Sequence, residues 1–179
     1  MATDAVAVPA AMDGTGDDPA GRVAVLFDAH HQRLFRLARR LVRQPEDPAD
    51  LVQETFLRVA RAPHRVPQGS SSEEAWLVRV LINVCRDQWR HAAVRQRAAA
   101  EGHVGPPGAV NPEPGMVAHA MVWQALDLLP PRRRAILVLA ELEGTPVPDI
   151  ARTLGVTPVT VRWHLMRARR EMARALGDE

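Results

Sequence analysis

A segment rich in proline and glycine divides the chain and constrains its fold more than any other feature. Within residues 98–116 lie the runs GPPG and NPEPG. Proline lacks a backbone N–H and glycine is conformationally free, so we expect neither a helix nor a strand to continue through this stretch. The sequence therefore predicts a linker, residues 98–117, between two small domains, residues 22–97 and residues 118–179.

The charge follows the same division. The first 21 residues carry four aspartates and no arginine, and they lack apolar periodicity, which predicts a disordered acidic tail. Residues 101–127 are also acidic and free of basic residues, so all 23 arginines lie in the two predicted domains. The net charge of +2 thus conceals two basic modules, which is typical of surfaces that face a polyanion. From charge alone, solvated helix faces rich in arginine remain the alternative.

Several classes of protein are excluded. One cysteine, Cys85, allows no internal disulfide, and we expect it to be a buried, inert thiol. The histidines show no zinc-ligand spacing, and no phosphate loop, nucleophile motif or carboxylate pair stands out, so we expect no metal, no cofactor and no enzyme activity. Neither a signal peptide nor a membrane-spanning run is visible, which predicts a cytoplasmic protein without membrane insertion.

Apolar residues at helical spacing predict an all-α fold in the first domain. The first helix has apolar positions from Phe27 to Leu41 and stops at a proline-containing turn. A second helix is expected from Asp50, and a third is expected to be capped by Ser72. The second helix would bury the apolar side formed by Leu51, Val52, Thr55, Phe56 and Val59.

The third predicted helix carries a polar stripe. Arg79, Asn83, Arg86 and Arg90 follow the spacing i, i+4, i+7, i+11. The opposite side is apolar and contains Leu77, Val80, Leu81 and Val84. Arginine supplies charge and paired donors, and asparagine offers both a donor and an acceptor to one base, so the stripe can reach phosphates and base edges. A solvated face is the competing interpretation.

The C-terminal domain contains the pattern of a helix-turn-helix. A short helix, residues 148–154, precedes the turn Gly155-Val156-Thr157 and a final helix, residues 158–176. Gly155 suits the left-handed backbone conformation that such a turn needs. The expected core of the motif consists of Ile150, Ala151, Leu154, Val156, Val161 and Leu165. Facing away from it are the side chains expected to enter or flank the major groove, Thr160, Trp163, Arg167 and Arg170.

Short motifs follow one another along the two predicted domains. In the first half they are DLVQETFLR at 50–58 and AWLVRVLIN at 75–83, followed by Asp87 and Arg90. In the second half they are ALDLLP at 125–130, Arg134, DIA at 149–151, LGV at 154–156, TVR at 160–162 and RAR at 167–169. In their order and spacing the chain resembles the sigma-70 family of bacterial RNA polymerase initiation factors, and within it the short extracytoplasmic-function (ECF) group. The resemblance covers about residues 22–97 and 118–176.

The resemblance implies a role for each surface. The first domain would be sigma region 2, and its second helix would dock on the clamp helices of the polymerase β′ subunit through Asp50, Leu51, Gln53, Glu54 and Phe56. The −10 promoter element would be bound, and its strands opened, by Arg79, Asn83, Arg86, Asp87 and Arg90. The second domain would be sigma region 4, and its helix-turn-helix would read the −35 element through Thr157, Thr160, Arg162, Trp163, Arg167 and Arg170.

The function implied is promoter-specific initiation by core RNA polymerase, with the β flap as a further contact. The resemblance also implies an anti-sigma factor as a partner, through which the protein would be held at the membrane. The alternative is a dimeric helix-turn-helix repressor or activator that reads duplex DNA. The chain departs from the family at Val159 and Trp163, where glycine and serine are frequent. Trp163 either contacts thymine methyl groups or fills a gap between helices.

Overall fold

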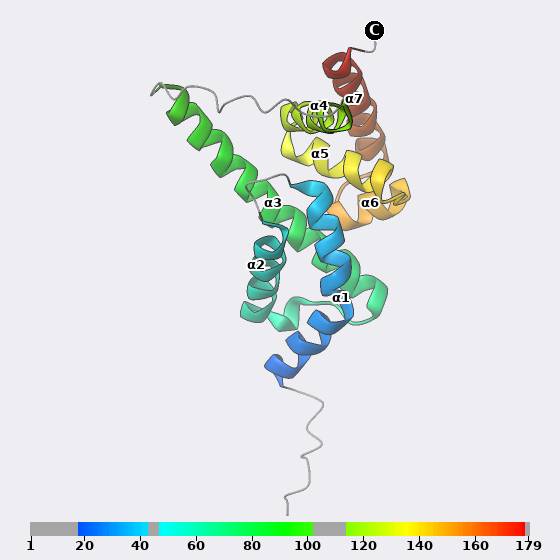
Figure 1. The fold of residues 1–179 in the computed structure, drawn as a ribbon. Coiled ribbons are helices and arrows are strands. Elements are labelled where there is room, and N and C mark those ends of the chain that lie inside the picture. Colours follow the sequence, from blue (N-terminus) through cyan, green and yellow to red (C-terminus); the bar gives the residue numbers. More distant parts are fainter. Residues whose placement is uncertain (1–17, 43–46, 102–113, 178–179) are drawn as a thin grey trace, which may run out of the picture.

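The structure, a computed structural model, describes residues 18–42, 47–101 and 114–177. These residues form helices and no strand, so the predicted all-α class with two groups of helices is confirmed (Figure 1). The first group comprises α1 Pro19–Leu41, α2 Pro48–Arg61, the 3₁₀ turn η1 Pro63–Arg65 and α3 Ser70–Glu101. The second comprises α4 Pro114–Leu128, α5 Pro131–Leu137 with its π-helical continuation η2 Val138–Leu142, α6 Val147–Leu154 and α7 Pro158–Leu176.

Local sequence explains where several helices begin and end. Asp18 and Asp47 cap α1 and α2 by accepting hydrogen bonds from backbone N–H groups of the first turn, and each is followed by proline at a position where no N–H is needed. Thr157 caps α7 in the same way. Gly155 ends α6 with a φ of +64°, the left-handed conformation that the helix-turn-helix interpretation required of it.

Several helix bounds differ from the expectation. α2 begins at Pro48 and α3 at Ser70, so Asp50 and Ser72 lie inside the helices that they were expected to start. α3 continues to Glu101 and α4 begins at Pro114, so both ends of the predicted linker, residues 98–117, are helical. The reasons are the favourable helix propensity of an alanine-rich stretch and the tolerance of proline at the start of a helix. α1 likewise begins at Pro19, within the predicted tail. The rest of the tail, residues 1–17, and of the linker, residues 102–113, lie outside the described residues.

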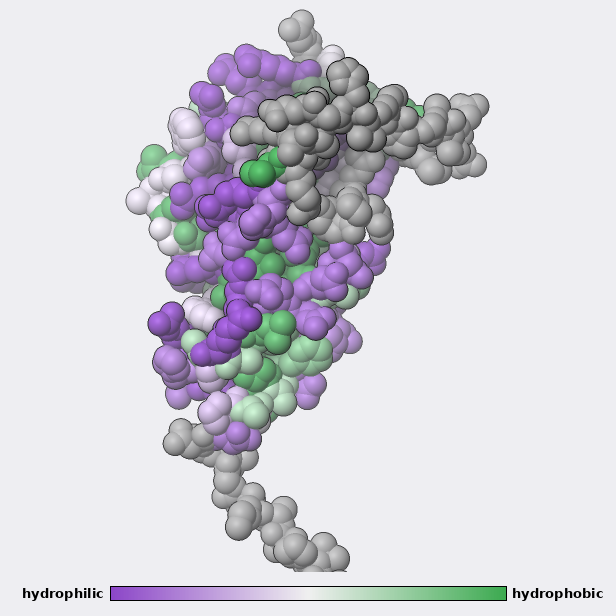
Figure 2. Space-filling view, turned by 90° about the vertical axis from the view of Figure 1, so that its left-hand side faces the viewer, coloured by the Kyte–Doolittle hydropathy of each residue, from purple (hydrophilic) through white to green (hydrophobic). Residues whose placement is uncertain are grey.

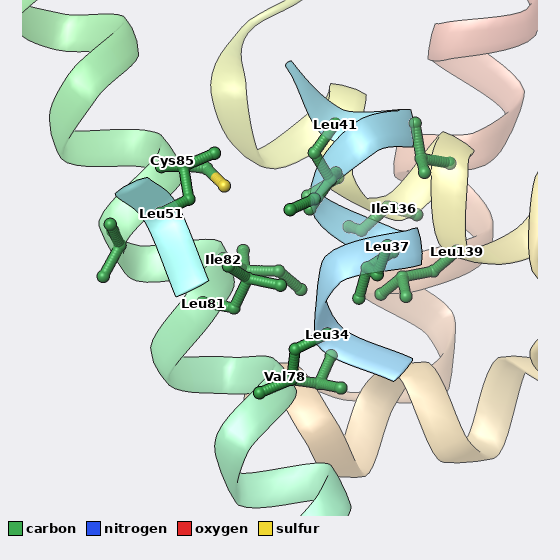
Figure 3. Close-up of a cluster of buried hydrophobic side chains, with 14 of the residues drawn as sticks. Leu34, Leu37, Leu41, Leu51, Val78, Leu81, Ile82, Cys85, Ile136 and Leu139 are labelled. Atoms are coloured by element: carbon green, nitrogen blue, oxygen red, sulfur yellow. The ribbon is translucent and has the colours of Figure 1, made fainter. Parts of the chain in front are cut away.

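The two groups of helices share one continuous core. α3 contacts α1 and α2 of its own group, and also α5 and α6 of the second group. Figure 3 shows Leu37 of α1 and Ile82 of α3 in the same buried cluster as Ile136 of α5. α3 can do this because it buries two flanks, where the sequence analysis expected one. Leu77, Leu81 and Val84 are buried, and so are Val78, Ile82 and Cys85, whereas Val80 is half-buried.

Charged contacts also join the two groups. The side chain of Glu143, in the turn after η2, is 4% exposed, and its carboxylate accepts hydrogen bonds from Arg33 and Arg40 of α1. Arg40 also donates to the carbonyl oxygen of Leu142 at 2.6 Å. Burial lowers the pKa of Arg33, but the bonds and charges of Glu143 and Glu74 outweigh this effect and raise it above its usual value. We call this arrangement of Arg33, Arg40 and Glu143 the Glu143 contact.

Candidate nucleic-acid and polymerase interface

The helix-turn-helix presents one side of α7 to solvent. Ile150, Ala151, Val161 and Leu165 are buried, while Leu154 and Val156 are half-buried, so the expected core of the motif forms. Opposite this core, the exposed residues of α7 include Val159, Arg162, Trp163, Met166, Arg167 and Arg170. The predicted −35 face is therefore accessible, and it is both basic and apolar.

Two threonines of the predicted −35 set have a structural role in this conformation. The Thr157 hydroxyl accepts a hydrogen bond from the backbone N–H of Thr160 at 3.2 Å. The two hydroxyl groups are also 2.8 Å apart and hydrogen-bonded to each other. Both side chains thus stabilise the first turn of α7.

Trp163 does not fill a gap between helices. Its side chain is 47% exposed, and the guanidinium groups of Arg133 and Arg167 lie 5.8 and 5.5 Å from its ring centroid. Arg133 is itself fixed, because its Nη1 donates to both carboxylate oxygens of Glu171 at 2.5 Å. The cation–π contacts hold the ring in place at the surface.

The polar stripe lies on the outer side of α3, but part of it is engaged by the second group of helices. Arg79 donates to the carbonyl oxygens of Arg152, at 2.6 Å, and of Thr153. These carbonyls lie at the C-terminal end of α6, where the helix dipole favours a cation. A small pocket next to this contact is lined by Asn83, Arg86 and Arg132, among others. The predicted −10 surface is thus partly covered by the region that carries the −35 surface.

A charged network connects α2 to the far end of the stripe. Arg58 donates to Glu54 at 2.9 Å and to Asp87 at 3.2 Å, and Arg90 donates to Asp87 at 3.1 Å. The hydrogen bond to Glu54, together with the interactions with Asp87, raises the pKa of Arg58 above its usual value despite partial burial. Glu54 and Asp87 were predicted in different sites, and the structure links them through Arg58. Asp87 orients two arginines here.

The predicted polymerase-binding residues of α2 separate into two sets. Asp50 and Gln53 are exposed, whereas Leu51 and Phe56 are 0% and 6% exposed and belong to the core. As buried residues, Leu51 and Phe56 support the helix from within and present no side chain to a partner in this conformation. The exposed apolar residue of the helix is Leu57, at 46%. Figure 2, which views this side of the molecule, shows apolar surface among hydrophilic side chains.

Sequence reasoning missed the residues that join the two groups, namely Arg33, Arg40 and Glu143. No local pattern marks them, because their contact joins positions about a hundred residues apart in the chain. It also missed that Trp89 lies against Arg134, with the guanidinium 4.7 Å from the ring centroid. Such contacts depend on tertiary packing, which periodicity does not report.

Cys85 is buried, as expected, and burial raises the pKa of its thiol to about 12. No group of three potential metal ligands occurs among the described residues. Within the described ranges, no helix combines the length and hydrophobicity needed to cross a membrane.

Comparisons with known proteins cover both groups of helices. The family model for sigma-70 region 2 matches residues 26–95, and the model for sigma-70 region 4 matches residues 119–172. Among relatives, the ECF RNA polymerase sigma factor SigE of Mycolicibacterium smegmatis is 37% identical over 91% of this chain, which covers 65% of SigE. SigM of Mycobacterium tuberculosis, also an ECF sigma factor, is 36% identical over 85% of this chain, which covers 76% of SigM.

Two solved structures share the fold. The sigma factor RpoE of Bartonella quintana, in complex with the anti-sigma factor NepR, matches 88% of this chain and 96% of its own chain with a TM-score of 0.58 and 21% identity. CnrH, in complex with the cytosolic domain of CnrY, matches 90% of this chain and 96% of its own with a TM-score of 0.57 and 24% identity. With both region models matched in order and two relatives above 35% identity, the chain belongs to the sigma-70 family, in its extracytoplasmic-function group of RNA polymerase sigma factors.

Proposed function

We propose that this chain binds core RNA polymerase and directs it to promoters by recognising a −35 and a −10 element and assisting strand opening. The observation that carries this proposal is the order of two matched regions along one chain, region 2 before region 4. A left-handed Gly155 and an exposed basic face on α7 support DNA binding by the second region. The chain would act as an initiation subunit without catalytic activity of its own.

The stripe on α3 is proposed to bind the −10 element. Asn83 and Arg90 are exposed, and Arg86 donates to the Asn83 Oδ1 at 3.4 Å, which places the amide beside a cation. An amide placed among arginines suits a base taken out of the stack, because it pairs with the base edge while the cations hold the phosphates. Extruding a base costs a few kcal/mol, which these contacts would offset.

Two surfaces are proposed to bind the polymerase. Asp50 and Gln53 on α2 would meet basic residues of the β′ clamp helices, and the neighbouring Leu57 would add apolar contact. α4 also keeps apolar side chains at the surface, since Met121 is 44% exposed and Leu128 is 75% exposed. An apolar helix face of this kind fits an apolar partner segment, and we assign it to the β flap.

An anti-sigma factor is a further proposed partner. The fold neighbour RpoE was solved with the anti-sigma factor NepR, and the shared fold supports a similar mode of control here. Because the polymerase is a cytoplasmic enzyme, we place the chain in the cytoplasm, on the nucleoid when it is bound to polymerase, with membrane retention only through such a partner.

Transcription in vitro tests the proposal. Core polymerase is incubated with a promoter library in the presence or absence of this chain, and the transcripts are sequenced. We expect new start sites preceded by shared elements at two positions. Transcription that stays at the level of core polymerase alone would contradict the proposal and favour the dimeric repressor or activator, for which the region 2 match offers no support.

A second measurement separates a sigma factor from a protein that merely occupies the polymerase. Replacing Arg79, Asn83 and Arg90 by alanine should abolish initiation while polymerase binding persists, because the predicted polymerase surface on α2 does not include them. If the triple variant initiates normally, the assignment of the −10 surface is wrong.

A further inference from the structure

An apolar row lies in the middle of the exposed side of α7. Val159, Trp163 and Met166 follow the spacing i, i+4, i+7 and are 71%, 47% and 53% exposed. We call these three residues the α7 ridge. Large apolar side chains with this exposure gain free energy when a partner covers them. The ridge lies on the side of α7 opposite the buried residues Val161, Leu165 and Ala168.

Arginines flank the ridge on both sides. On the helical projection, Arg162 lies on one side of the ridge and Arg167 lies on the other. Arg170 follows in line with the ridge itself, toward the C-terminal end of α7. Among the described residues, Arg162 and Arg170 form no ion pair, so their charges are available to a polyanion. This distribution fits duplex DNA, in which a groove floor lies between two phosphate backbones. A protein partner would not require cations on both sides of an apolar row.

The tryptophan at the centre of the ridge is held rigidly. Arg133 and Arg167 lie over its ring, and Glu171 fixes Arg133 through two hydrogen bonds of 2.5 Å. A ring that is fixed before binding loses little conformational entropy on contact. More of the free energy from burying its apolar area is therefore available for binding DNA. Glu171 and Arg133 therefore act as positioning residues for Trp163.

The chemistry of the major groove determines what such a ridge recognises. Among the groups displayed there, the C5-methyl group of thymine is the apolar one, while the others are hydrogen-bond donors and acceptors. Valine offers no hydrogen-bonding group to a base edge, methionine offers only a weakly accepting sulfur, and tryptophan offers only its single indole N–H donor. Resting on the proposed −35 role of α7, we propose that the α7 ridge selects thymines in the −35 element through their methyl groups, with Trp163 as the main specificity determinant.

Replacing thymine by uracil tests this directly, because dU keeps base pairing and removes only the methyl group. A duplex library randomised at the −35 position, in front of a fixed −10 element, is selected with the full chain bound to core polymerase. Each enriched dT is then changed to dU, singly, and binding is measured. For the wild-type chain we expect about a fourfold loss of affinity at one or more of these positions, the size expected for one buried methyl group.

Variants identify the residue responsible. Trp163→Ala should bind the selected duplex more weakly and should no longer distinguish dT from dU, whereas Trp163→Phe should keep part of the discrimination. Arg162→Ala is the matched control, because a phosphate contact should weaken dT and dU duplexes by the same factor. Circular dichroism of each variant checks that α7 is intact.

The outcomes separate this inference from the proposed function. If no duplex is enriched and no transcript starts, the proposed function fails. If duplexes are enriched and transcribed but the wild-type chain binds dT and dU equally at every position, only the inference is overturned. The inference also fails if Trp163→Ala retains full methyl discrimination, or if it lowers polymerase binding without any change in DNA selectivity.

Discussion

The two predicted DNA-binding surfaces differ in how far the structure leaves them accessible. On α7 the predicted −35 face is open to solvent, and its central Trp163 is fixed in place. On α3 the predicted −10 stripe is partly covered, because Arg79 binds the C-terminal carbonyls of α6. The α7 face is accessible to a partner. The α3 stripe is partly covered by α6, which belongs to the same group of helices as α7.

This difference has a consequence for promoter binding. Elements at −35 and −10 lie about 25 base pairs apart, or about 85 Å along B-DNA at the usual rise. Two surfaces that touch each other through Arg79 and α6 do not span that distance. Binding to both elements therefore requires the two groups of helices to separate, which breaks the shared core and the Glu143 contact.

The largest effect is expected from the shared core. Ile136 is fully buried, and Figure 3 shows it in the cluster that also contains Leu37 and Ile82 of the first group. Replacing it by alanine should lower the free energy of unfolding by about 2–5 kcal/mol, since it removes buried methylene groups and leaves a cavity. Chemical denaturation followed by circular dichroism measures this.

Exposed Val159 provides the control, because Val159→Ala should change stability by less than about 0.5 kcal/mol. If the groups share a core, helix signals from both should be lost in one transition in the wild-type chain. Two separate transitions, with Ile136→Ala affecting only one of them, would contradict the shared core.

The next effect concerns the Glu143 contact. Replacing Glu143 by glutamine removes a buried charge from between Arg33 and Arg40. Because the side chains of these arginines are 31% and 46% exposed, the cost should lie below the roughly 3–5 kcal/mol lost when a fully buried pair is broken. Fluorophores on α2 and α7 should then report a larger mean separation. If coverage of the α3 stripe limits DNA binding, the promoter affinity of the holoenzyme should rise. If polymerase already separates the two groups of helices completely, that affinity should stay unchanged.

Glu141→Gln is the matched control. Glu141 is also acidic and lies two residues earlier, within η2, but it binds Arg169 of its own group at 2.6 Å and its side chain is 43% exposed. An exposed pair contributes about 1 kcal/mol or less, so this variant should leave the separation unchanged. Equal opening by both variants would mean that general loss of negative charge, and not the Glu143 contact, controls the separation.

Much of the helical architecture could be predicted from the sequence, because the signals involved are local. The apolar spacing of α1 and α2 and the glycine at position 155 each depend on a few neighbouring residues. They appear in the structure as expected except at Phe27, which is 41% exposed while Leu26 is buried. The two-sided burial of α3 could not be predicted in the same way. The burial of Val78, Ile82 and Cys85 beside the expected apolar side becomes clear only when the tertiary neighbours of α3, which are α1, α2, α5 and α6, are known.

The candidate site shows the same limit. The positions of Asn83, Arg162 and Arg170 on outer helix faces follow from periodicity. The burial of Leu51 and Phe56 also follows from periodicity, which conflicts with their place in the predicted polymerase-binding set. The capping role of Thr157 and the binding of Arg79 to α6 depend on backbone groups that a residue pattern does not display. Membership of a binding motif thus does not separate the residues that touch a partner from those that support them.

A smaller effect is expected at Cys85, whose reactivity reports whether the two groups of helices remain packed against each other. Burial raises the pKa of its thiol to about 12, so almost no thiolate exists at pH 8 and a thiol reagent should react very slowly. The group's folded pKa lies above its unfolded value of 9.0, so its contribution to stability is complete below pH 9 and is lost as the pH rises toward 12. Labelling at pH 8 should be faster in Glu143→Gln than in Glu141→Gln. Equal and rapid labelling in the wild-type chain would contradict the burial.

The smallest effect is expected at His164, on α7 of the second group only. Partial burial, with the charges of Arg132 and Arg133, lowers its pKa below 6.5. The unfolded chain therefore binds a proton more readily than the folded one as the pH falls below 6.5, and stability decreases toward the lowered pKa. Thermal unfolding should show a lower midpoint at pH 5.5 than at pH 7.5, and His164→Gln should reduce this difference. The separation of the two groups depends on the Glu143 contact and not on His164, so the distance between the fluorophores should change little between pH 7.5 and pH 5.5. A large change would show that the two groups are coupled through α7 as well.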